Sequence, residues 1–188
     1  MDVQALREQF PTLRADEPLT YLDNACVTLR PDSVIDAIRD YYTKQPACAG
    51  RSPHRWGTAV TQMVSRTRRK VGRFIGAQPS GVVFMRNTTE AINQVASGID
   101  WRDGDIVLTS DREHNSNLVP WQMVAQQTGA RLCFIPVGEH GALDLSSLDT
   151  IINRRTRLVS VVSVSNFLGT INPVETIRDR ARQVGALL

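Results

Sequence analysis

From residue 81 onward, two kinds of apolar pattern alternate along the chain. Short runs rich in consecutive apolar residues are followed by longer stretches in which apolar side chains recur at helical spacing. The first pattern is typical of buried strands and the second of amphipathic helices. The predicted strands cover 81–85, 105–109, 131–137 and 157–164, and 186–188 begins a further one. The predicted helices cover 88–97, a segment that begins near 117 or 120, then 145–152 and 175–184. This order predicts βαβ units, and therefore a three-layer α/β fold with a mostly parallel sheet and helices on both faces.

The chain before residue 76 follows a different pattern, without the alternation. Helical spacing predicts helices over 3–10, 34–43 and 58–75, with a brief extended piece at 20–23 and a loop at 45–53. We therefore expect residues 1–75 to form an N-terminal arm of helices and residues 76–188 to belong to the α/β domain.

Polar clusters follow three of the apolar runs, at the point where each run ends. These clusters cover 86–90, 112–117 and 165–170. The carboxyl ends of parallel strands meet at one edge of an open sheet, and ligands bind in the crevice there. The clusters therefore predict a site in which a phosphate cradle, an imidazole and an amide surround one small molecule.

The cluster at 86–90 has the composition of a helix N-terminus that binds an anion. Asn87 can cap the helix, and Glu90 lies three residues later, as in a capping box. The first amides of the helix, together with the hydroxyls of Thr88 and Thr89, suit a phosphate group. An ordinary capped helix is the alternative, because no glycine-rich fingerprint accompanies the cluster.

The other two clusters each admit more than one role. His114 could act as an acid or base, ligate a metal or stack on an aromatic ring, and a plain surface histidine is the alternative. No metal site is indicated, because the sequence has no second histidine at i+4 and no nearby cysteine. Asn166 could donate an amide hydrogen to a phenolate or carbonyl oxygen, or it could close an Asx-type turn.

Composition and charge narrow the class of protein. The chain of 188 residues is 41% hydrophobic and 22% charged, as in a globular protein. The net charge of +3 is too weak to indicate nucleic acid. The basic run at 66–70 with Arg73 avoids the apolar stripe of its helix, so we interpret it as a solvated face, and a contact with the phosphate backbone of a nucleic acid is the alternative. We expect no nucleic-acid partner, and no membrane partner either, because no apolar stretch is long enough to span a bilayer.

The number and spacing of the cysteines indicate a reducing environment. Cys26, Cys48 and Cys133 are odd in number and widely spaced, so neither a disulfide framework nor a zinc site is indicated. The first residues show no signal pattern of basic and then apolar positions. We therefore expect a reducing, cytoplasmic setting.

Four ordered stretches resemble the fold type I, class V group of pyridoxal-phosphate enzymes, and most of all its cysteine desulfurases. The stretches are 21–25, 86–93, 113–121 and 164–173. The resemblance extends over nearly the whole chain and implies that it is the first part of the large, cofactor-binding domain. The implied cofactor is pyridoxal 5'-phosphate.

The resemblance also implies roles for individual residues. Thr88 and Thr89 would hold the cofactor phosphate, His114 would stack on the pyridine ring, and Asn166 would lie near the ring's phenolic oxygen. The loop of Asn24, Ala25 and Cys26 would border a small amino-acid substrate. Cys26 departs from the family pattern, which often has a second small residue there.

The family's remaining chemical groups would lie beyond Leu188. These groups are the aspartate that pairs with the pyridinium nitrogen, the lysine that forms the Schiff base and the nucleophilic cysteine. Neither Lys44 nor Lys70 lies in a sequence that fits the lysine motif. We therefore expect no catalytic residue within this chain, and no activity from it alone.

The resemblance implies C–S bond cleavage of L-cysteine and sulfur transfer, of the kind used in iron–sulfur cluster biogenesis. Class V aminotransferase and selenocysteine lyase activities are alternatives in an intact enzyme, and a non-catalytic fragment or interaction module is a third interpretation. The implied partners are a second copy of the chain or a complementary C-terminal polypeptide, and a sulfur-acceptor protein.

Overall fold

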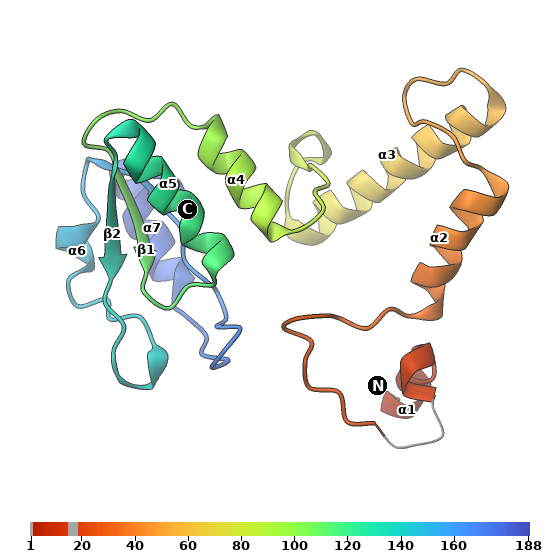
Figure 1. The fold of residues 1–188 in the computed structure, drawn as a ribbon, viewed down its shortest axis with the longest axis horizontal. Helices are drawn as coiled ribbons and strands as arrows, with labels where there is room; N and C mark the ends of the chain where they lie inside the picture. Colours follow the sequence, from red (N-terminus) through yellow and green to blue (C-terminus); the bar gives the residue numbers. More distant parts are fainter. Residues whose placement is uncertain (1, 15–18) are drawn as a thin grey trace. The chain divides into compact units, whose positions relative to one another are not determined.

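The structure is a computed structural model that describes residues 2–14 and 19–188 (Figure 1). The chain divides into two compact units, Met1–Val83 and Phe84–Leu188. The domain boundary expected between residues 75 and 76 stays a prediction. Within the described ranges, no helix combines the length and apolar character needed to cross a membrane.

The first unit is built from helices and loops. Its helices are α1 (Val3–Arg7), α2 (Asp32–Lys44) and α3 (Arg55–Ile75), with short 3-10 turns at Pro11–Arg14 and Pro79–Gly81. The helices predicted at 34–43 and 58–75 are confirmed by α2 and α3. The helix predicted over 3–10 is too long, because Pro11 disfavours helical backbone at the residue before it. The long helix α3 ends at Gly76, whose φ of 69° places it in the left-handed conformation that glycine adopts readily.

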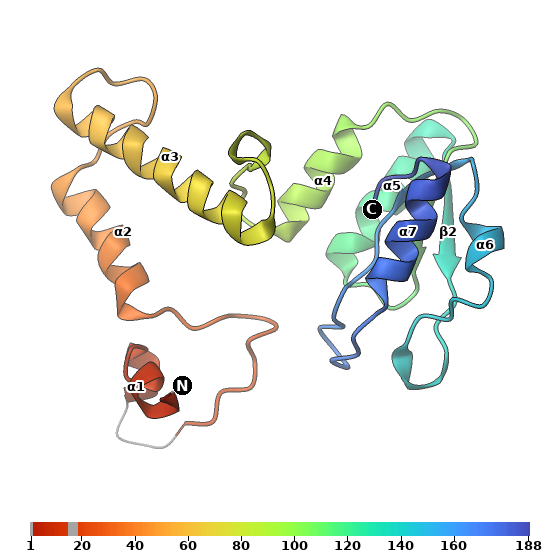
Figure 2. The same ribbon diagram turned by 180° about the vertical axis from the view of Figure 1, so that it is seen from behind.

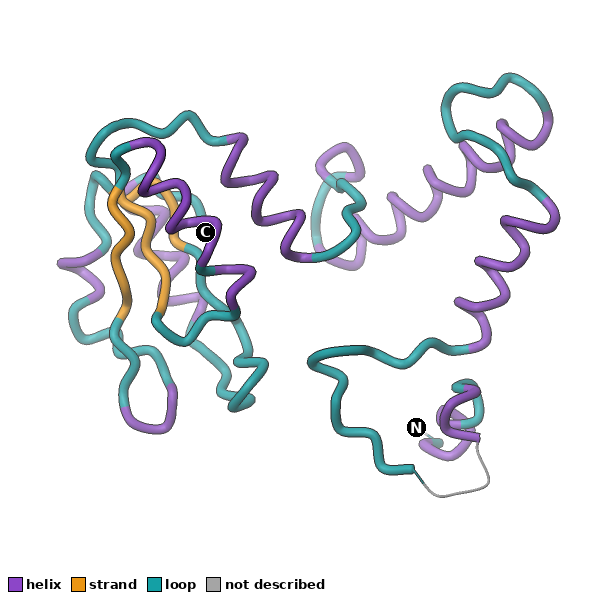
Figure 3. The backbone as a smooth tube through the Cα atoms, in the orientation of Figure 1, coloured by secondary structure: helices purple, strands orange, loops and turns teal. Residues whose placement is uncertain are grey.

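The second unit contains a three-stranded parallel sheet with the order β2-β1-β3 (Figure 3). The strands are β1 (Ile106–Ser110), β2 (Arg131–Ile135) and β3 (Thr156–Val159). The helices are α4 (Thr88–Gly98), α5 (Val119–Thr128), α6 (Leu148–Ile151) and α7 (Val174–Val184), with 3-10 turns at Asn115–Asn117 and Glu139–Gly141.

Alternating side chains of the central strand divide the core into two layers. Leu108 is fully buried in a cluster with Leu148 of α6, with Ile152 directly after α6 and with Ile177 of α7. The neighbouring Val107 is fully buried in a second cluster with Trp121 of α5 and with residues of α4. Opposite views of the ribbon show α5 on one face of the sheet and α7 on the other (Figures 1 and 2). The predicted three-layer arrangement is therefore confirmed.

The prediction of a strand at 81–85 is wrong. Val82 is buried, but Val83 and Phe84 are 72% and 48% exposed, and the backbone amide of Val82 continues a 3-10 turn by donating to Pro79. An apolar run becomes a strand only when a neighbouring strand pairs with its backbone, and no described strand pairs with this one. The polar cluster at 86–90 consequently follows an extended segment instead of a strand.

Several other elements are shorter than predicted. Strand β2 stops at Ile135 because Pro136 has no amide to donate. Helix α6 covers only Leu148–Ile151, since Asp144 accepts from the Ser146 amide and holds the preceding residues in a turn. The run predicted at 157–164 is a strand only as far as Val159, and 186–188 contributes a single parallel bridge between Leu187 and Leu158.

Replacing Leu108 with alanine tests the central position of β1. We expect the free energy of unfolding to fall by about 2–5 kcal/mol, because the substitution leaves a cavity in a fully enclosed core. Urea unfolding followed by the fluorescence of Trp101 and Trp121 measures this, since both rings lie in the second unit and pack edge to face. Leu188→Ala is the matched control, because that side chain is 52% exposed and its loss should cost less than about 0.5 kcal/mol. Equal losses in the two variants would contradict the packing described.

Candidate functional site

The first turn of α4 presents polar groups that suit an anion. The side-chain oxygen of Asn87 accepts a hydrogen bond from the Glu90 amide at 2.9 Å and caps the helix. The amides of Thr88 and Thr89 come before the first intrahelical hydrogen bond, and both residues are exposed. The partial positive charge of the helix N-terminus adds to these donors. The turn therefore offers two amides and two hydroxyls to a phosphate group.

The capping box predicted at Asn87 and Glu90 forms only in part. Glu90 does not return a hydrogen bond to the Asn87 amide and instead accepts from the Arg86 amide at 2.8 Å. The Arg86 guanidinium also donates two hydrogen bonds to the second carboxylate oxygen, at 3.1 and 2.9 Å. The hydrogen bonds from the Arg86 side chain and then from its backbone lower the pKa of Glu90 below its ordinary value of 4.5. The Glu90 carboxylate is thus paired with Arg86 beside the first turn of α4.

Ser116 connects that turn to His114. Its hydroxyl lies 2.7 Å from the Thr89 hydroxyl, and its amide donates to Nδ1 of His114 at 3.1 Å. Since Nδ1 accepts this hydrogen bond, the neutral imidazole carries its proton on Nε2. His114 is exposed, so one flat imidazole lies two hydrogen bonds away from the first turn of α4. The structure thereby brings together two of the predicted clusters, 86–90 and 112–117.

Glu113 and Asn117 hold the loop that carries His114. Glu113 Oε1 accepts from the Ser110 hydroxyl at 2.8 Å and from the Val162 amide at 2.9 Å, while its Oε2 accepts from Asn117 Nδ2 at 2.9 Å. Asn117 Oδ1 accepts from Ser160 Oγ at 2.5 Å and from the Trp121 indole at 3.1 Å. These bonds join the carboxyl end of β1 to the segment that leaves β3.

Sequence reasoning missed the roles of Ser116, Glu113 and Asn117, although all three lie inside a cluster that it identified. The partner of Asn117, Ser160, and the partner of Glu113, Val162, lie 43 and 49 residues further along the chain, and Thr89, the partner of Ser116, lies 27 residues earlier. The only signal available was the concentration of polar residues directly after a buried strand.

Asn166 lies in a turn at the end of a short hairpin. An antiparallel bridge joins Val164 and Ile171, and Ser165 Oγ accepts from the amides of Phe167 and Leu168. The Asn166 side chain is exposed. In the described part of the chain, no hydrogen bond joins it to His114, and its predicted role stays a prediction.

The predicted substrate loop lies in the first unit and is described by itself. Asn24, Ala25 and Cys26 form an exposed turn in which the Cys26 amide donates to Asp23 at 3.1 Å. Asn24 also lines a cavity of about 260 Å³ together with Arg7 and Tyr21. Partial burial, followed by the negative charge of nearby Asp23, raises the pKa of Tyr21 above 10.0.

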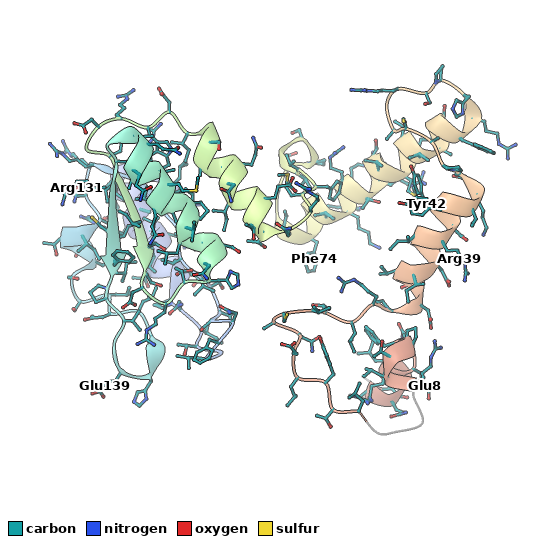
Figure 4. All side chains as sticks on the ribbon, viewed as in Figure 1. Glu8, Arg39, Tyr42, Phe74, Arg131 and Glu139 are labelled. Carbon is teal, nitrogen blue, oxygen red and sulfur yellow. The ribbon has the colours of Figure 1, made fainter. Side chains whose placement is uncertain are left out.

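Two labelled side chains mark the ends of β2. Arg131 stands at the amino end of the strand, and Glu139 lies just beyond its carboxyl end (Figure 4). The loop that follows β1 and carries His114 leaves the same carboxyl edge, because the strands are parallel. Across residues 2–14 and 19–188, no group of three histidine, cysteine, aspartate or glutamate side chains could hold a metal ion. The arrangement suits a phosphorylated, flat organic molecule.

Comparisons with known proteins give one family. The aminotransferase class-V family model matches residues 20–188. A Streptomyces coelicolor protein named "probable cysteine desulfurase" is 41% identical over 201 residues, which cover 100% of this chain and 48% of that protein. The chain spans about half the length of the curated relatives it matches.

Solved structures of cysteine desulfurases are also similar to this chain. The apo cysteine desulfurase from Thermococcus onnurineus NA1 has a TM-score of 0.90 at 36% identity, covering 97% of this chain and 45% of that one. The cysteine desulfurase CsdA from Escherichia coli has a TM-score of 0.86 at 30% identity, covering 100% of this chain and 48% of that one.

The Arg86–Glu90 interaction predicts a pH dependence. Because the pKa of Glu90 is lowered in the folded state, its carboxylate stabilises the fold above pH 4.5, and this contribution is lost as the pH falls through the folded pKa. Glu90→Gln should therefore lower the thermal midpoint at pH 7 by about 2 °C or less, because the pair is exposed to solvent, with a difference that shrinks as the pH falls below 4.5. Circular dichroism melts across this range measure the midpoint. Glu139→Gln, at an exposed turn, should show no such difference; a pH-independent effect of Glu90→Gln would contradict the assignment.

Proposed function

The chain belongs to the aminotransferase class-V family, and from this premise we propose that it forms part of a pyridoxal-phosphate site of the cysteine desulfurase type. The whole protein would break the C–S bond of L-cysteine, release alanine and pass the sulfur to an acceptor thiolate. Relatives that carry the name cysteine desulfurase support this reaction.

The proposal rests above all on the hydrogen bonds from Thr89 through Ser116 to His114. Thr88 and Thr89 would hold the cofactor phosphate with their hydroxyls and amides, and these donors fit a phosphate dianion. His114 would lie against the pyridine ring, because the Ser116 amide fixes its exposed imidazole next to the phosphate-binding turn. The bound cofactor would supply an electron sink for the substrate's Cα. The chain's own residues bind and orient the ring.

Two further assignments extend the proposal. Asn166 would direct its amide toward the ring's phenolic oxygen, and its exposed side chain supports this role. The turn of Asn24, Ala25 and Cys26 would border the amino-acid substrate, supported by the cavity that Asn24 lines in the first unit.

We also propose the partners and setting that this activity requires. The partners would be a second copy of the chain or a complementary polypeptide, and a sulfur-acceptor protein. Cys26, Cys48 and Cys133 are unpaired, which supports a reducing, cytoplasmic setting.

Binding of pyridoxamine 5'-phosphate tests the phosphate and ring contacts. This probe has no aldehyde, so it cannot bond to a lysine. The double variant Thr88→Ala/Thr89→Ala should raise its Kd about tenfold or more, because hydrogen bonds to a charged group are lost. His114→Ala should also weaken binding, whereas His114→Phe should restore part of the affinity through stacking.

Isothermal titration calorimetry measures these constants, and pyridoxamine without the phosphate is the matched control ligand. Its weaker binding should respond to His114→Ala and not to the threonine variant. Unchanged affinity of pyridoxamine 5'-phosphate in both variants would refute the assignment of the site.

The chain alone should release no sulfide from L-cysteine in the presence of pyridoxal phosphate. Its only two lysines lie on helices of the first unit, and Lys44 is paired with Asp40 at 2.9 Å. A sulfide assay, with borohydride trapping and peptide mapping, checks this expectation. A specifically trapped cofactor on Lys44 or Lys70, accompanied by sulfide release, would overturn it.

A further inference from the structure

We propose that Glu113 and Asn117 are a positioning pair that sets the place of His114 relative to the segment leaving β3. The inference rests on the proposed function, because it assigns the pair a role in binding the phosphorylated ring. Neither residue would touch the ring; both would act through His114.

The pair closes the loop on both sides of the histidine. Glu113 directly precedes His114, Asn117 lies three residues after it, and their side chains meet at 2.9 Å. The backbone amide of Asn117 donates to the backbone carbonyl of His114 at 2.7 Å inside the same loop. The backbone that carries the imidazole is therefore fixed at its two ends.

The same two side chains also bind the segment that leaves β3. Glu113 accepts from the Val162 amide, and Asn117 accepts from the Ser160 hydroxyl. Residues 160–162 leave β3 and lead to the hairpin that carries Asn166. One hydrogen-bonded pair thus fixes two segments from which the proposed cofactor contacts come.

Donor and acceptor chemistry makes these residue types necessary. The Trp121 indole can only donate, and its side chain is 1% exposed, so the Asn117 oxygen must face it and the Asn117 NH2 group must face Glu113. The Val162 amide also can only donate. Both oxygens of residue 113 must therefore accept, which a carboxylate does and a glutamine amide does not.

The pattern of donors and acceptors predicts that the pair can be exchanged. Glu113→Gln alone brings two NH2 groups together, and Asn117→Asp alone brings two carboxylates together. In the double variant Glu113→Gln/Asn117→Asp, the glutamine oxygen accepts from Ser110 and Val162, and its NH2 group donates to the new carboxylate. The second carboxylate oxygen accepts from Ser160 and Trp121, so every contact and the net charge are restored.

The experiment combines ligand binding with the NMR signals of the three histidines. We expect each single variant to raise the Kd of pyridoxamine 5'-phosphate about tenfold, because polar contacts are lost or opposed. Each should also shift the ring signals of His114. The signals of His54 and His140 should stay in place. The double variant should return the Kd to within about twofold of the original and restore the His114 signals.

Controls separate positioning from stability and from the proposed function. Ile152→Val weakens the core on the other face of the sheet, and should lower the thermal midpoint without moving the Kd or the His114 signals. A single variant that fails to fold while the exchanged pair folds with native His114 signals supports the proposal. If the original chain does not bind the probe, the proposed function fails, and the His114 signals alone decide the role of the pair. Single variants that leave those signals unchanged, or a double variant that does not restore them, would overturn it.

Discussion

Strand β1 is enclosed on every side, because β2 and β3 pair with its two edges and helices cover both of its faces. All five of its residues are buried, including Thr109 and Ser110 at its carboxyl end. Buried hydroxyls need partners. Thr109 donates to the Ser160 carbonyl at 2.7 Å and Ser110 donates to Glu113. Burial of this strand end therefore requires the polar network that also supports His114. The same hydrogen bonds serve the packing of β1 and the position of the candidate site residue.

The sequence predicted an element well where interactions between residues close in the chain determine it. Asn87 caps α4 in the structure because a capping side chain needs only its own helix, and β1 follows its predicted range closely because it lies between two other strands. The run at 81–85 misled the prediction because apolar composition does not reveal whether a partner strand exists. The same limit applies to Ser116, Glu113 and Asn117, whose roles depend on residues that only the fold brings near.

The cofactor and substrate proposals rest on different parts of the molecule. The hydrogen bonds that connect Thr89, Ser116, His114, Glu113 and Val162 all lie within the second unit, so the proposed phosphate and ring contacts belong to one hydrogen-bonded network. The turn at Asn24 belongs to the first unit and is supported by its own cavity and by the family pattern. Family membership connects the two proposals, and the geometry of the second unit gives the cofactor proposal independent support.

The bond between the Thr89 and Ser116 hydroxyls has no fixed polarity, since either oxygen can be the donor. Rotation of two O–H bonds reverses its direction without moving a heavy atom. If an anion binds at Thr89 as proposed, the Thr89 hydroxyl would donate to the anion while the Ser116 hydroxyl donates to Thr89. The first turn of α4 would then offer one more donor to the anion and keep the hydrogen bond between Thr89 and Ser116. Binding would therefore need no rearrangement of the backbone around His114.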